Sequence, residues 1–405
     1  MSRMTMEQQE ETGRGMTVEK KVWGLSGLVS LILTAVLFYL WASLNHFEQD
    51  PTQLPEQASV DTYLDSLENA PDYRVRTGIF LKSFSFVDAS DVHVTGYVWQ
   101  HYQTGIHDAI KPEPGQAGFL LPESVDVGSG LIEEAYRMPE PGGEVIGWYF
   151  EQTLRQSFDY TSYPFDHKTV WVRFWPGRFD VNVALVPDFD AYPATGPKDI
   201  FGIDNRIVMG TWERENTYFD YKLSDLDTTL GINQNEFQTR LPELHYNFVI
   251  KRNFANAFVV HMIPLIVVTM LLFGAVMTVT RKPNLVERHD FSTSSVIGTC
   301  SVLFFVILLA HVQLREGFAG SPVIYMESFF FLMYFMLLVV SVNTYLFVSE
   351  SAPSLRLIHY RDNLIPKAAF WPFVLSCMIA ITAYNLSLKS PPSTDAPEAI
   401  THQDG

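Results

Sequence analysis

The residues with the clearest chemical meaning lie in one apolar segment, residues 294–314, and in the stretch that leads into it. Five hydroxyl side chains fall between residues 292 and 299, and the rest of the segment is mostly apolar. On a helix every third or fourth residue lies on one face, which here carries Ser292, Ser295, Thr299, Val302, Val306, Leu309 and Gln313. Polar side chains can line a water-filled path, and a ring of apolar ones can close it by dewetting. The pattern predicts a pore-lining helix with a gate at 302–309.

A buried helix is the alternative for the same segment. Ser and Thr hydroxyls inside a helix commonly donate to a carbonyl of the preceding turn, so they can be packed without water. Five hydroxyls within residues 292–299 exceed what such packing requires. The pattern therefore favours the pore.

The rest of the chain offers little catalytic chemistry. It contains no HExxH, GxSxG, Walker or strand-linked GxGxxG motif. Five histidines show no metal-ligand spacing with partner carboxylates: His93, His101, His107, His167 and His245. The pairs Asp188/Asp190 and Asp225/Asp227 suit a cation held in a loop, and they suit solvated turns more often. We expect no enzyme activity, no cofactor and no metal centre.

Five apolar spans place the hydroxyl-rich segment in a membrane. Each has about 20 mostly apolar residues, the length that crosses a bilayer, and they are residues 23–45, 254–280, 294–314, 324–349 and 367–388. The first span could also be a cleaved signal peptide. Its apolar run is longer than the usual h-region of about 7–15 residues and no A-x-A site follows, so a retained N-terminal anchor is expected.

Basic residues beside the spans set the expected orientation. Lys and Arg cluster before the first span, between the second and third, and between the fourth and fifth, and such clusters face the cytoplasm. The N-terminus is then cytoplasmic. Three segments lie on the outer side of the cell (inner) membrane: residues 46–251, 315–323 and 389–405. The formal charge is −17, with most acids in the outer block. This argues against nucleic-acid binding and would concentrate cations, although an acidic solvated surface is an equally good reading.

The outer block is predicted to be a β-sandwich. Alternating apolar residues, separated by turns rich in Gly, Pro, Asp and Asn, mark strands at 77–88, 92–102, 168–176, 179–187 and 243–252. A short helix is expected at 59–69. Both cysteines, Cys300 and Cys377, fall in apolar spans, so the block has no disulfide and depends on its own core.

Several segments resemble one known family in their order and spacing. FDYTSYPFDHKTVWVRF (158–174) is similar to its signature loop, and PELHYNFVIKRNFANAFVVHMIP (242–264) to the strand that runs into its first channel helix. VRTGIFLKSFSFVDASDVHVTGYVW (75–99) resembles its first two strands, and SPVIYMESFFFLMYFM (321–336) the start of its third channel helix. The chain thus resembles the prokaryotic pentameric ligand-gated ion channels, which lack the disulfide of the animal Cys-loop receptors. The helix at 23–45 departs from that family.

The resemblance implies a homopentamer around a central pore. Aligning the chain through Pro322 turns Gly298, Phe305 and Val312 toward the pore, a second register beside the one above. The expected pore-lining set drawn from both registers is Ser295, Thr299, Val302, Phe305, Val306 and Leu309. Either register leaves an apolar gate in the middle of the helix.

Ion selectivity is read from the acids before the pore helix. Glu287 and Asp290 lie at its expected cytoplasmic mouth, where an acidic ring attracts cations. Arg288 and His289 lie between them, and acids near a helix N-terminus are also ordinary partners of the helix dipole. The acids favour cation conduction.

Coupling and ligand binding follow from the resemblance alone. It implies a charged cluster of Asp88, Asp166 and Arg252 above the turn at Pro322. An Arg between carboxylates can be a hub whose geometry differs between closed and open states, or it can form a static ion pair.

Agonists of the family bind between neighbouring sandwiches under a hairpin, here 222–242. Aromatic rings there can hold a cation or only pack, and the candidates are Trp148, Tyr149, Trp212, Tyr218 and Tyr221. A small molecule, a proton or a cation remains possible as ligand.

Together these features predict an α+β membrane protein with an outer β-sandwich, a four-helix transmembrane domain and one extra N-terminal helix. The expected parts are a stub 1–22, an anchor 23–45, a ligand-binding domain 46–251, a channel domain 252–388 and a polar tail 389–405. A sensory receptor or a non-conducting scaffold that signals to a separate partner is the alternative, but the inner segments are too short to hold an output domain. A transporter is disfavoured because the spans show no inverted repeat.

Overall fold

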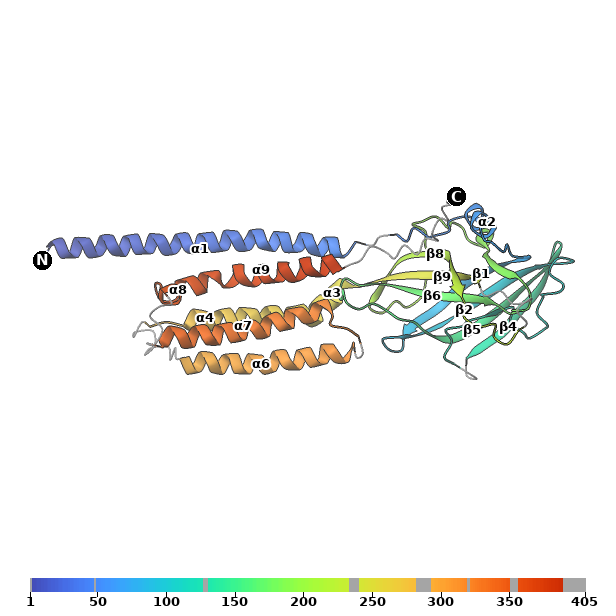
Figure 1. Cartoon of the computed structure of the whole chain (residues 1–405). Coiled ribbons are helices and arrows are strands. Elements are labelled where there is room, and N and C mark those ends of the chain that lie inside the picture. The colour runs from blue at the N-terminus through green and yellow to red at the C-terminus, as the bar shows by residue number, and fades with distance from the viewer. Residues whose placement is uncertain are drawn as a thin grey trace, which may run out of the picture. The chain divides into compact units, whose positions relative to one another are not determined.

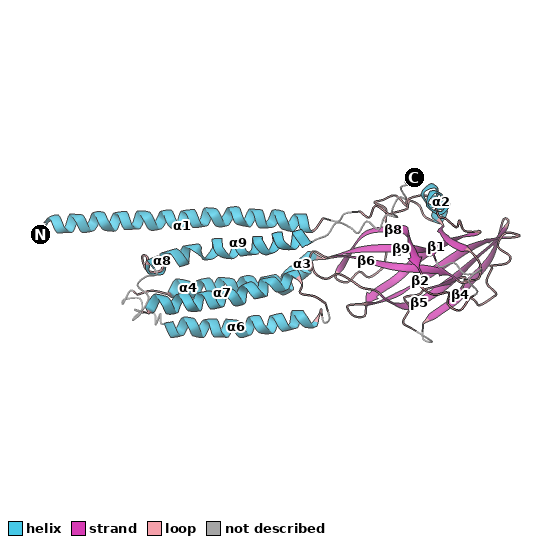
Figure 2. Ribbon diagram, viewed as in Figure 1, coloured by secondary structure: helices cyan, strands magenta, loops and turns pink. Residues whose placement is uncertain are grey.

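The computed structural model describes residues 2–46, 49–126, 130–232, 240–281, 293–318, 321–349 and 356–388, with side chains from residue 18 onward except at 225, 240 and 241. These residues form a mixed α+β structure with two β-sheets and five long apolar helices (Figure 2). This confirms the coarse fold expected from the sequence. The chain divides into two compact units, a sheet unit and a helical unit.

The sheet unit takes its described residues from 49–159 and 167–253. Its five-stranded sheet has the order β4-β5-β2-β1-β7, formed by Leu131–Glu140, Gly143–Arg155, Asp91–Gln103, Tyr73–Phe86 and Val183–Pro187. Its four-stranded sheet has the order β3-β6-β9-β8, formed by Phe119–Leu120, His167–Pro176, Arg240–Arg252 and Trp212–Asp225. Neighbouring strands are antiparallel except β1 and β7, which are parallel. A helix α2 (Gln57–Asp65) and a 3₁₀ turn η1 (Phe189–Ala191) complete the unit.

Both sheets contribute to one hydrophobic core. Alternate residues of a strand face the same side, and β2 shows this with Val92, Val94 and Val98 fully buried between half-buried neighbours. Phe150 of β5 and Phe174 of β6 join the same core from different sheets. All five predicted strands are present, the one expected at 179–187 only as β7. The hairpin of β4 and β5 and the strand β8 were not predicted.

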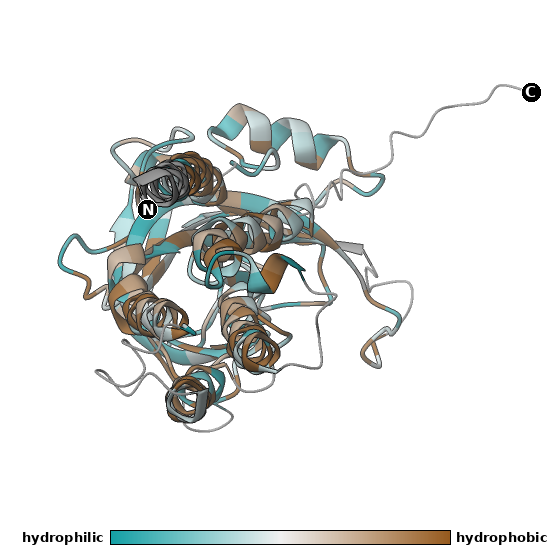
Figure 3. Ribbon diagram, turned by 90° about the vertical axis from the view of Figure 1, so that its left-hand side faces the viewer, coloured by the Kyte–Doolittle hydropathy of each residue, from teal (hydrophilic) through white to brown (hydrophobic). Residues whose placement is uncertain are grey.

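The helical unit contains α1, residues 160–166 and the described chain from Phe254 to the end of α9. Its helices are α1 (Ser2–Leu44), α3 (Phe254–Ala257), the π-helical turn η2 (Phe258–Met262), α4 (Ile263–Thr278), α6 (Thr293–Glu316), α7 (Tyr325–Val348), α8 (Arg356–His359) and α9 (Leu364–Leu388). Helices α4, α6, α7 and α9 run side by side, and α1 lies along α9 (Figure 1). Seen along their axes, hydrophobic residues predominate on them (Figure 3).

Five stretches are long and apolar enough to cross a membrane: Val18–Leu44, Phe254–Thr278, Thr293–Glu316, Tyr325–Val348 and Leu364–Leu388. They agree closely with the spans predicted from hydropathy. By length and composition the chain is therefore a multi-pass membrane protein.

The π-helical turn η2 has a local cause in the sequence. Pro264 lies two residues after its end, and a proline inside a helix lacks an N–H and clashes with the carbonyl four residues earlier. That carbonyl, on residue 260, lies within η2. The wider π turn gives the ring room without breaking the span.

Candidate functional site

Helix α6 packs against the rest of the helical unit with one narrow stripe. Its buried side chains are Val296, Cys300, Leu303, Ile307 and Leu314, which share a face at helical spacing. The most exposed large side chains lie on the far side: Val302 (64%), Phe305 (67%) and Leu309 (62%). These three positions are spaced as i, i+3 and i+7, so the exposed stripe combines both expected registers.

The six residues predicted to line a pore are all exposed in the single chain: Ser295, Thr299, Val302, Phe305, Val306 and Leu309. The Thr299 hydroxyl donates to the Ser295 carbonyl at 2.9 Å, so hydroxyls of α6 are satisfied within the helix, as the buried-helix alternative expects. Their exposure means that this face meets lipid, water or another copy of the chain. Glu287 and Asp290, predicted to set selectivity, lie outside the described residues, as does Ser292.

A polar cluster ties the end of α6 to the start of α7. Glu327 is buried, and its Oε2 lies 3.3 Å from Arg315 Nη1. Arg315 also donates to the carbonyls of Ser321 at 2.6 Å and Pro322 at 3.2 Å. His311 Nε2 lies 3.5 Å from the other Glu327 oxygen. The turn that carries Pro322 is therefore held by charged side chains at the ends of both helices.

Residues 160–166, here named the PFD loop, join β5 to β6 in the sequence but pack among the helices. The Tyr163 ring lies 4.6 Å from that of Phe318, just after α6, and 5.8 Å from that of His261 in η2. These contacts belong to the helical unit. A loop between two strands is therefore part of the helix packing.

Two further contacts fix the PFD loop to the helix ends. The ring of Phe165 stacks on Phe254 of α3 with centroids 5.0 Å apart and planes 19° apart. The backbone N–H of Tyr325, the first residue of α7, donates to the Thr161 carbonyl at 2.7 Å. The PFD loop thus contacts the starts of both α3 and α7.

The residues predicted to couple the two parts are distributed over both units. Asp88 closes the turn between β1 and β2 by accepting two backbone N–H groups of that turn at 2.7 and 2.8 Å. Arg252, at the end of β9, holds its guanidinium 4.1 Å from the ring centroid of Trp212. Asp166 ends the PFD loop and is buried, and Pro322 lies in the turn described above. An ion pair among these charges stays a prediction.

The N-terminal helix α1 makes a polar contact near the start of α9. Pro372 lies inside α9, and a proline there leaves the carbonyl four residues earlier without its helical donor. That carbonyl belongs to Ala368, and the Ser26 hydroxyl of α1 donates to it at 2.5 Å. In a membrane such a carbonyl needs a partner from a neighbouring helix, and α1 supplies one.

A chain of hydrogen bonds joins the other end of α1 to α7 and α9. The indole N–H of Trp41 donates to the Tyr325 hydroxyl at 2.8 Å, which lies 2.8 Å from the Thr382 hydroxyl. Thr382 gives its own proton to the Met378 carbonyl at 2.7 Å. An indole N–H can only donate, so the direction of the chain is fixed: Trp41 to Tyr325 to Thr382 to Met378.

The two polar contacts have matched spacing. Ser26 and Trp41 are about 22 Å apart along α1, and Ala368 and Thr382 are about 21 Å apart along α9, at a rise of 1.5 Å per residue. The two helices therefore run in the same direction, as the predicted orientation of the spans requires. Trp41 also lies 6.1 Å from Phe165 of the PFD loop, so α1 reaches that loop.

The aromatic residues predicted to line a ligand site are Trp148, Tyr149, Trp212, Tyr218 and Tyr221. Four of them contact a ring outside the set, and the Tyr218 hydroxyl donates to Asp50 at 3.3 Å. The buried Trp148 donates to the Gln116 carbonyl at 3.0 Å, and Tyr221 donates to the Leu185 carbonyl at 2.7 Å. Within the described part of the sheet unit, no ring contact joins two of the five. They form no single cluster in one chain, and a site between chains stays a prediction. Residues 233–239 of the expected hairpin lie outside the described residues.

The sheet unit has a polar hollow of about 460 Å³ that the sequence did not indicate. His101 of β2 lies in it, with Nε2 3.0 Å from Asp188 and Nδ1 3.0 Å from Glu140 of β4. Trp99 donates to the same Asp188 oxygen at 2.8 Å. Asp188 is only 4% exposed, so reading it as a solvated turn residue was wrong.

The hollow predicts a pH dependence of stability. The hydrogen bond with Asp188 raises the pKa of His101, burial opposes this, and Glu140 adds to it. Burial would raise the pKa of Asp188, but the bonds from His101 and Trp99 outweigh it and lower that pKa. The other charged groups facing the site are Arg76, 3.6 Å from Asp188, and the exposed Asp190.

We expect protonated His101 to stabilise the folded state. This contribution to the free energy of unfolding should be complete below about pH 6.5, the ordinary histidine pKa, and should disappear as the pH rises through the raised pKa of His101. The measurement is the apparent melting temperature of the full chain from pH 5 to 9, compared with His101→Gln. The difference in melting temperature between the wild type and His101→Gln should become smaller as the pH rises. His107 is the control, because burial lowers its pKa. The difference in melting temperature between the wild type and His107→Gln should therefore become larger as the pH rises. A difference for His101→Gln that does not vary with pH would contradict the assignment.

In the described ranges, no group of three His, Cys, Asp or Glu side chains is arranged to hold a metal ion. No protein-family model matches the sequence, and no curated protein matches it.

Proposed function

We propose that this chain is one subunit of a homopentameric ligand-gated ion channel in the cell membrane. The observation that carries the proposal is the exposed face of α6. Five copies arranged with that face inward would place Ser295 and Thr299 around a water-filled path. Val302, Phe305 and Leu309 would form apolar rings that close it by dewetting.

The sheet unit is proposed to be the outer β-sandwich that binds the ligand, a small molecule, a proton or a cation. Its two sheets share one core, which is what a sandwich requires. The effect of ligand binding is proposed to reach the pore helix through the PFD loop and the turn at Pro322. Both meet the start of α7, since Thr161 accepts a hydrogen bond from Tyr325 and Glu327 holds Arg315, and this common endpoint supports a coupling role.

Cation conduction is part of the proposal because Glu287 and Asp290 precede α6 in the sequence. An acidic ring at the mouth of a pore favours cations. Exchanging both acids for glutamine should reduce the permeability ratio of sodium to chloride. An unchanged ratio would remove these residues from the selectivity filter.

The test of the proposed function is the symmetry of the purified full chain by electron microscopy, followed by ion flux in liposomes. We expect five subunits around an axis bordered by α6, and flux that depends on acid, divalent cations or small amines. A dimer, or α6 facing lipid, would overturn the proposal. Five-fold symmetry without flux under any of these stimuli would favour the non-conducting scaffold.

A further inference from the structure

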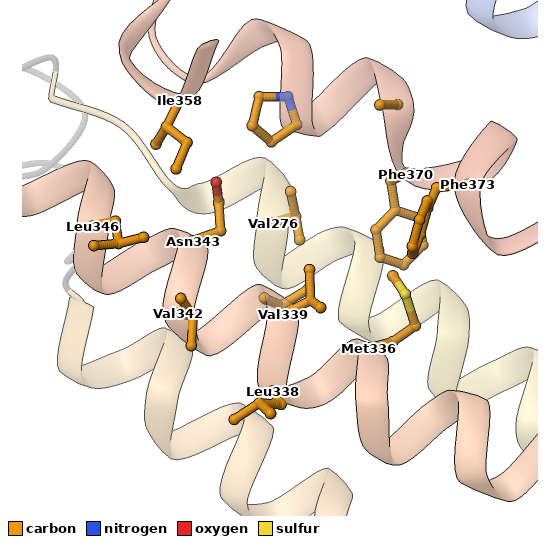
Figure 4. Close-up of a pocket in the computed structure, with 13 residues that line it drawn as sticks. Val276, Met336, Leu338, Val339, Val342, Asn343, Leu346, Ile358, Phe370 and Phe373 are labelled. Carbon is orange, nitrogen blue, oxygen red and sulfur yellow. The ribbon is translucent and has the colours of Figure 1, made fainter. Parts of the chain in front are cut away.

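A second feature of the helical unit points to a lipid. A groove of about 450 Å³ lies between α7, α4, α8 and α9 (Figure 4). Its lining is almost wholly apolar, with Val339 and Val342 from α7, Ile358 from α8 and Phe370 and Phe373 from α9. In a membrane-spanning unit, an apolar groove of this kind can take an acyl chain.

One polar side chain interrupts the lining. Asn343 of α7 lies in the groove, and within the described part of the chain its side chain has no hydrogen-bond partner. An amide left unpaired in apolar surroundings is costly, on the order of 1–3 kcal/mol. Asn343 is partly exposed, so the groove has a polar group that is open to a hydrogen bond from a molecule outside the chain.

The depth of Asn343 matches a particular part of a lipid. The residue lies about 7–8 Å before the end of α7 at 1.5 Å per residue. Helix α7 has 24 residues, about 36 Å, so its ends extend beyond a hydrocarbon core of about 30 Å. Asn343 then lies near the boundary between the acyl chains and the headgroups, where the ester groups of phospholipids are.

Basic residues border the groove at the same end of the helices. Arg356 is exposed and lies two residues before the lining residue Ile358, and Lys367 follows the lining residue Pro366. Arg281 is also exposed, and its guanidinium lies 4.9 Å from the ring centroid of Phe347 near the end of α7.

Among the described residues near these groups, little negative charge opposes them. Asp362 is the one acid in the described chain from 356 to 388. Its carboxylate already accepts hydrogen bonds from the Thr280 hydroxyl at 2.7 Å and the Arg281 backbone N–H at 2.9 Å. The border is therefore positive, and such pockets between helices on the cytoplasmic side attract anionic headgroups.

We propose that this groove binds one anionic phospholipid of the leaflet on the α8 side. An acyl chain fills the apolar part, an ester oxygen accepts from Asn343, and the phosphate lies among Arg281, Arg356 and Lys367. The order of apolar lining, amide and basic border along the helices is the order of chain, ester and phosphate in a phospholipid. The proposal requires a membrane-spanning chain and does not depend on ion conduction.

The test is native mass spectrometry of the purified full chain after exchange with palmitoyl-oleoyl phosphatidylglycerol or phosphatidylcholine. We expect the anionic lipid to be retained preferentially. Arg356→Gln should reduce this preference by about fivefold, since a basic residue at a membrane surface contributes about 1 kcal/mol. Arg206→Gln, in the sheet unit, is the charge-matched control and should leave it unchanged.

A second pair of variants tests the groove itself. Val342→Trp fills it, whereas Val348→Trp adds the same bulk on α7 outside the lining; the two valines are 46% and 49% exposed. Only the first should abolish lipid retention, with both variants checked for an unchanged melting temperature. Equal retention of both lipids by the wild type, or equal retention by both tryptophan variants, would overturn the proposal. Should Val342→Trp not fold, the Arg356 comparison still decides.

Discussion

Replacing Leu309 with serine is expected to produce a channel that opens at lower stimulus and conducts partly without one. Leu309, Val302 and Phe305 form the most exposed stripe of α6, and in the proposed pentamer each position becomes a ring of five side chains. Removing an apolar side chain from such a ring loses about 1.5–3 kcal/mol of hydrophobic transfer free energy per residue. Water then remains in the constriction, and the closed state loses its barrier.

Current recordings or liposome flux measure this effect, and Leu308→Ser supplies the control. Leu308 is adjacent in sequence but about 100° away around the helix and only 39% exposed. We expect at least a tenfold shift in half-maximal stimulus for Leu309→Ser and little shift for Leu308→Ser. Similar shifts in both variants would place the gate elsewhere, and a folded pentamer that is silent in every variant would favour the scaffold.

Replacing Trp41 with phenylalanine is expected to loosen α1 and to alter gating together. The change keeps an aromatic ring beside Phe165 but removes the only donor that Trp41 can offer to Tyr325. Interhelical hydrogen bonds in membranes contribute on the order of 1 kcal/mol, and in the proposed pentamer the change is repeated in each of the five subunits. Because Tyr325 also donates its backbone N–H to Thr161 of the PFD loop, the loss should reach the coupling contacts.

The measurements are the apparent melting temperature and the half-maximal stimulus. For Trp41→Phe we expect the apparent melting temperature to fall by about 2–4 °C and the half-maximal stimulus to shift several-fold. Trp23→Phe is the control, because it makes the same change on the same helix. The Trp23 side chain has no hydrogen bond to the described chain, so this variant should change neither the melting temperature nor the half-maximal stimulus. Tyr325→Phe combined with Trp41→Phe should cost less than the sum of the single changes. Equal effects of Trp23→Phe and Trp41→Phe would refute the role of the hydrogen-bond chain.

The sequence predicted the spans and the strands β1, β2, β6, β7 and β9 because the physics that sets them is local. A span needs about 20 apolar residues whatever surrounds it, and a half-buried strand such as β2 alternates visibly. Strands β4, β5 and β8 were missed. Strand β5 is central in its sheet, but it buries Ile146, Gly147 and Trp148 in succession and not alternately. Strand β4 carries Glu133, Glu134 and Arg137 with little burial, and β8 carries the buried polar residues Asn216 and Asp220, so neither shows a regular apolar pattern.

The candidate site was predictable where one helix face decides it and not where distant residues meet. Helical spacing and the resemblance gave two registers for α6, and its most exposed side chains, Val302, Phe305 and Leu309, come from both. The partners of His101 are 39 and 87 residues away, and Tyr325 is 284 residues from Trp41, so no spacing rule could join them. Glu327 did leave a signal, an acid three residues after Ile324 at a helix start, and its N-terminal capping bond to the Ile324 N–H is 2.9 Å long.

The placement of the PFD loop determines how hybrid proteins could be built from this chain. A simple splice at 253/254 would separate Tyr163 and Phe165 from Phe318 and Phe254, their ring partners in the same unit. A chimera that keeps the whole helical unit needs three further junctions, at 46/47, 159/160 and 166/167, so that α1 and the PFD loop stay with the other helices. A foreign receptor module grafted without the PFD loop would present mismatched aromatic surfaces to the helix ends.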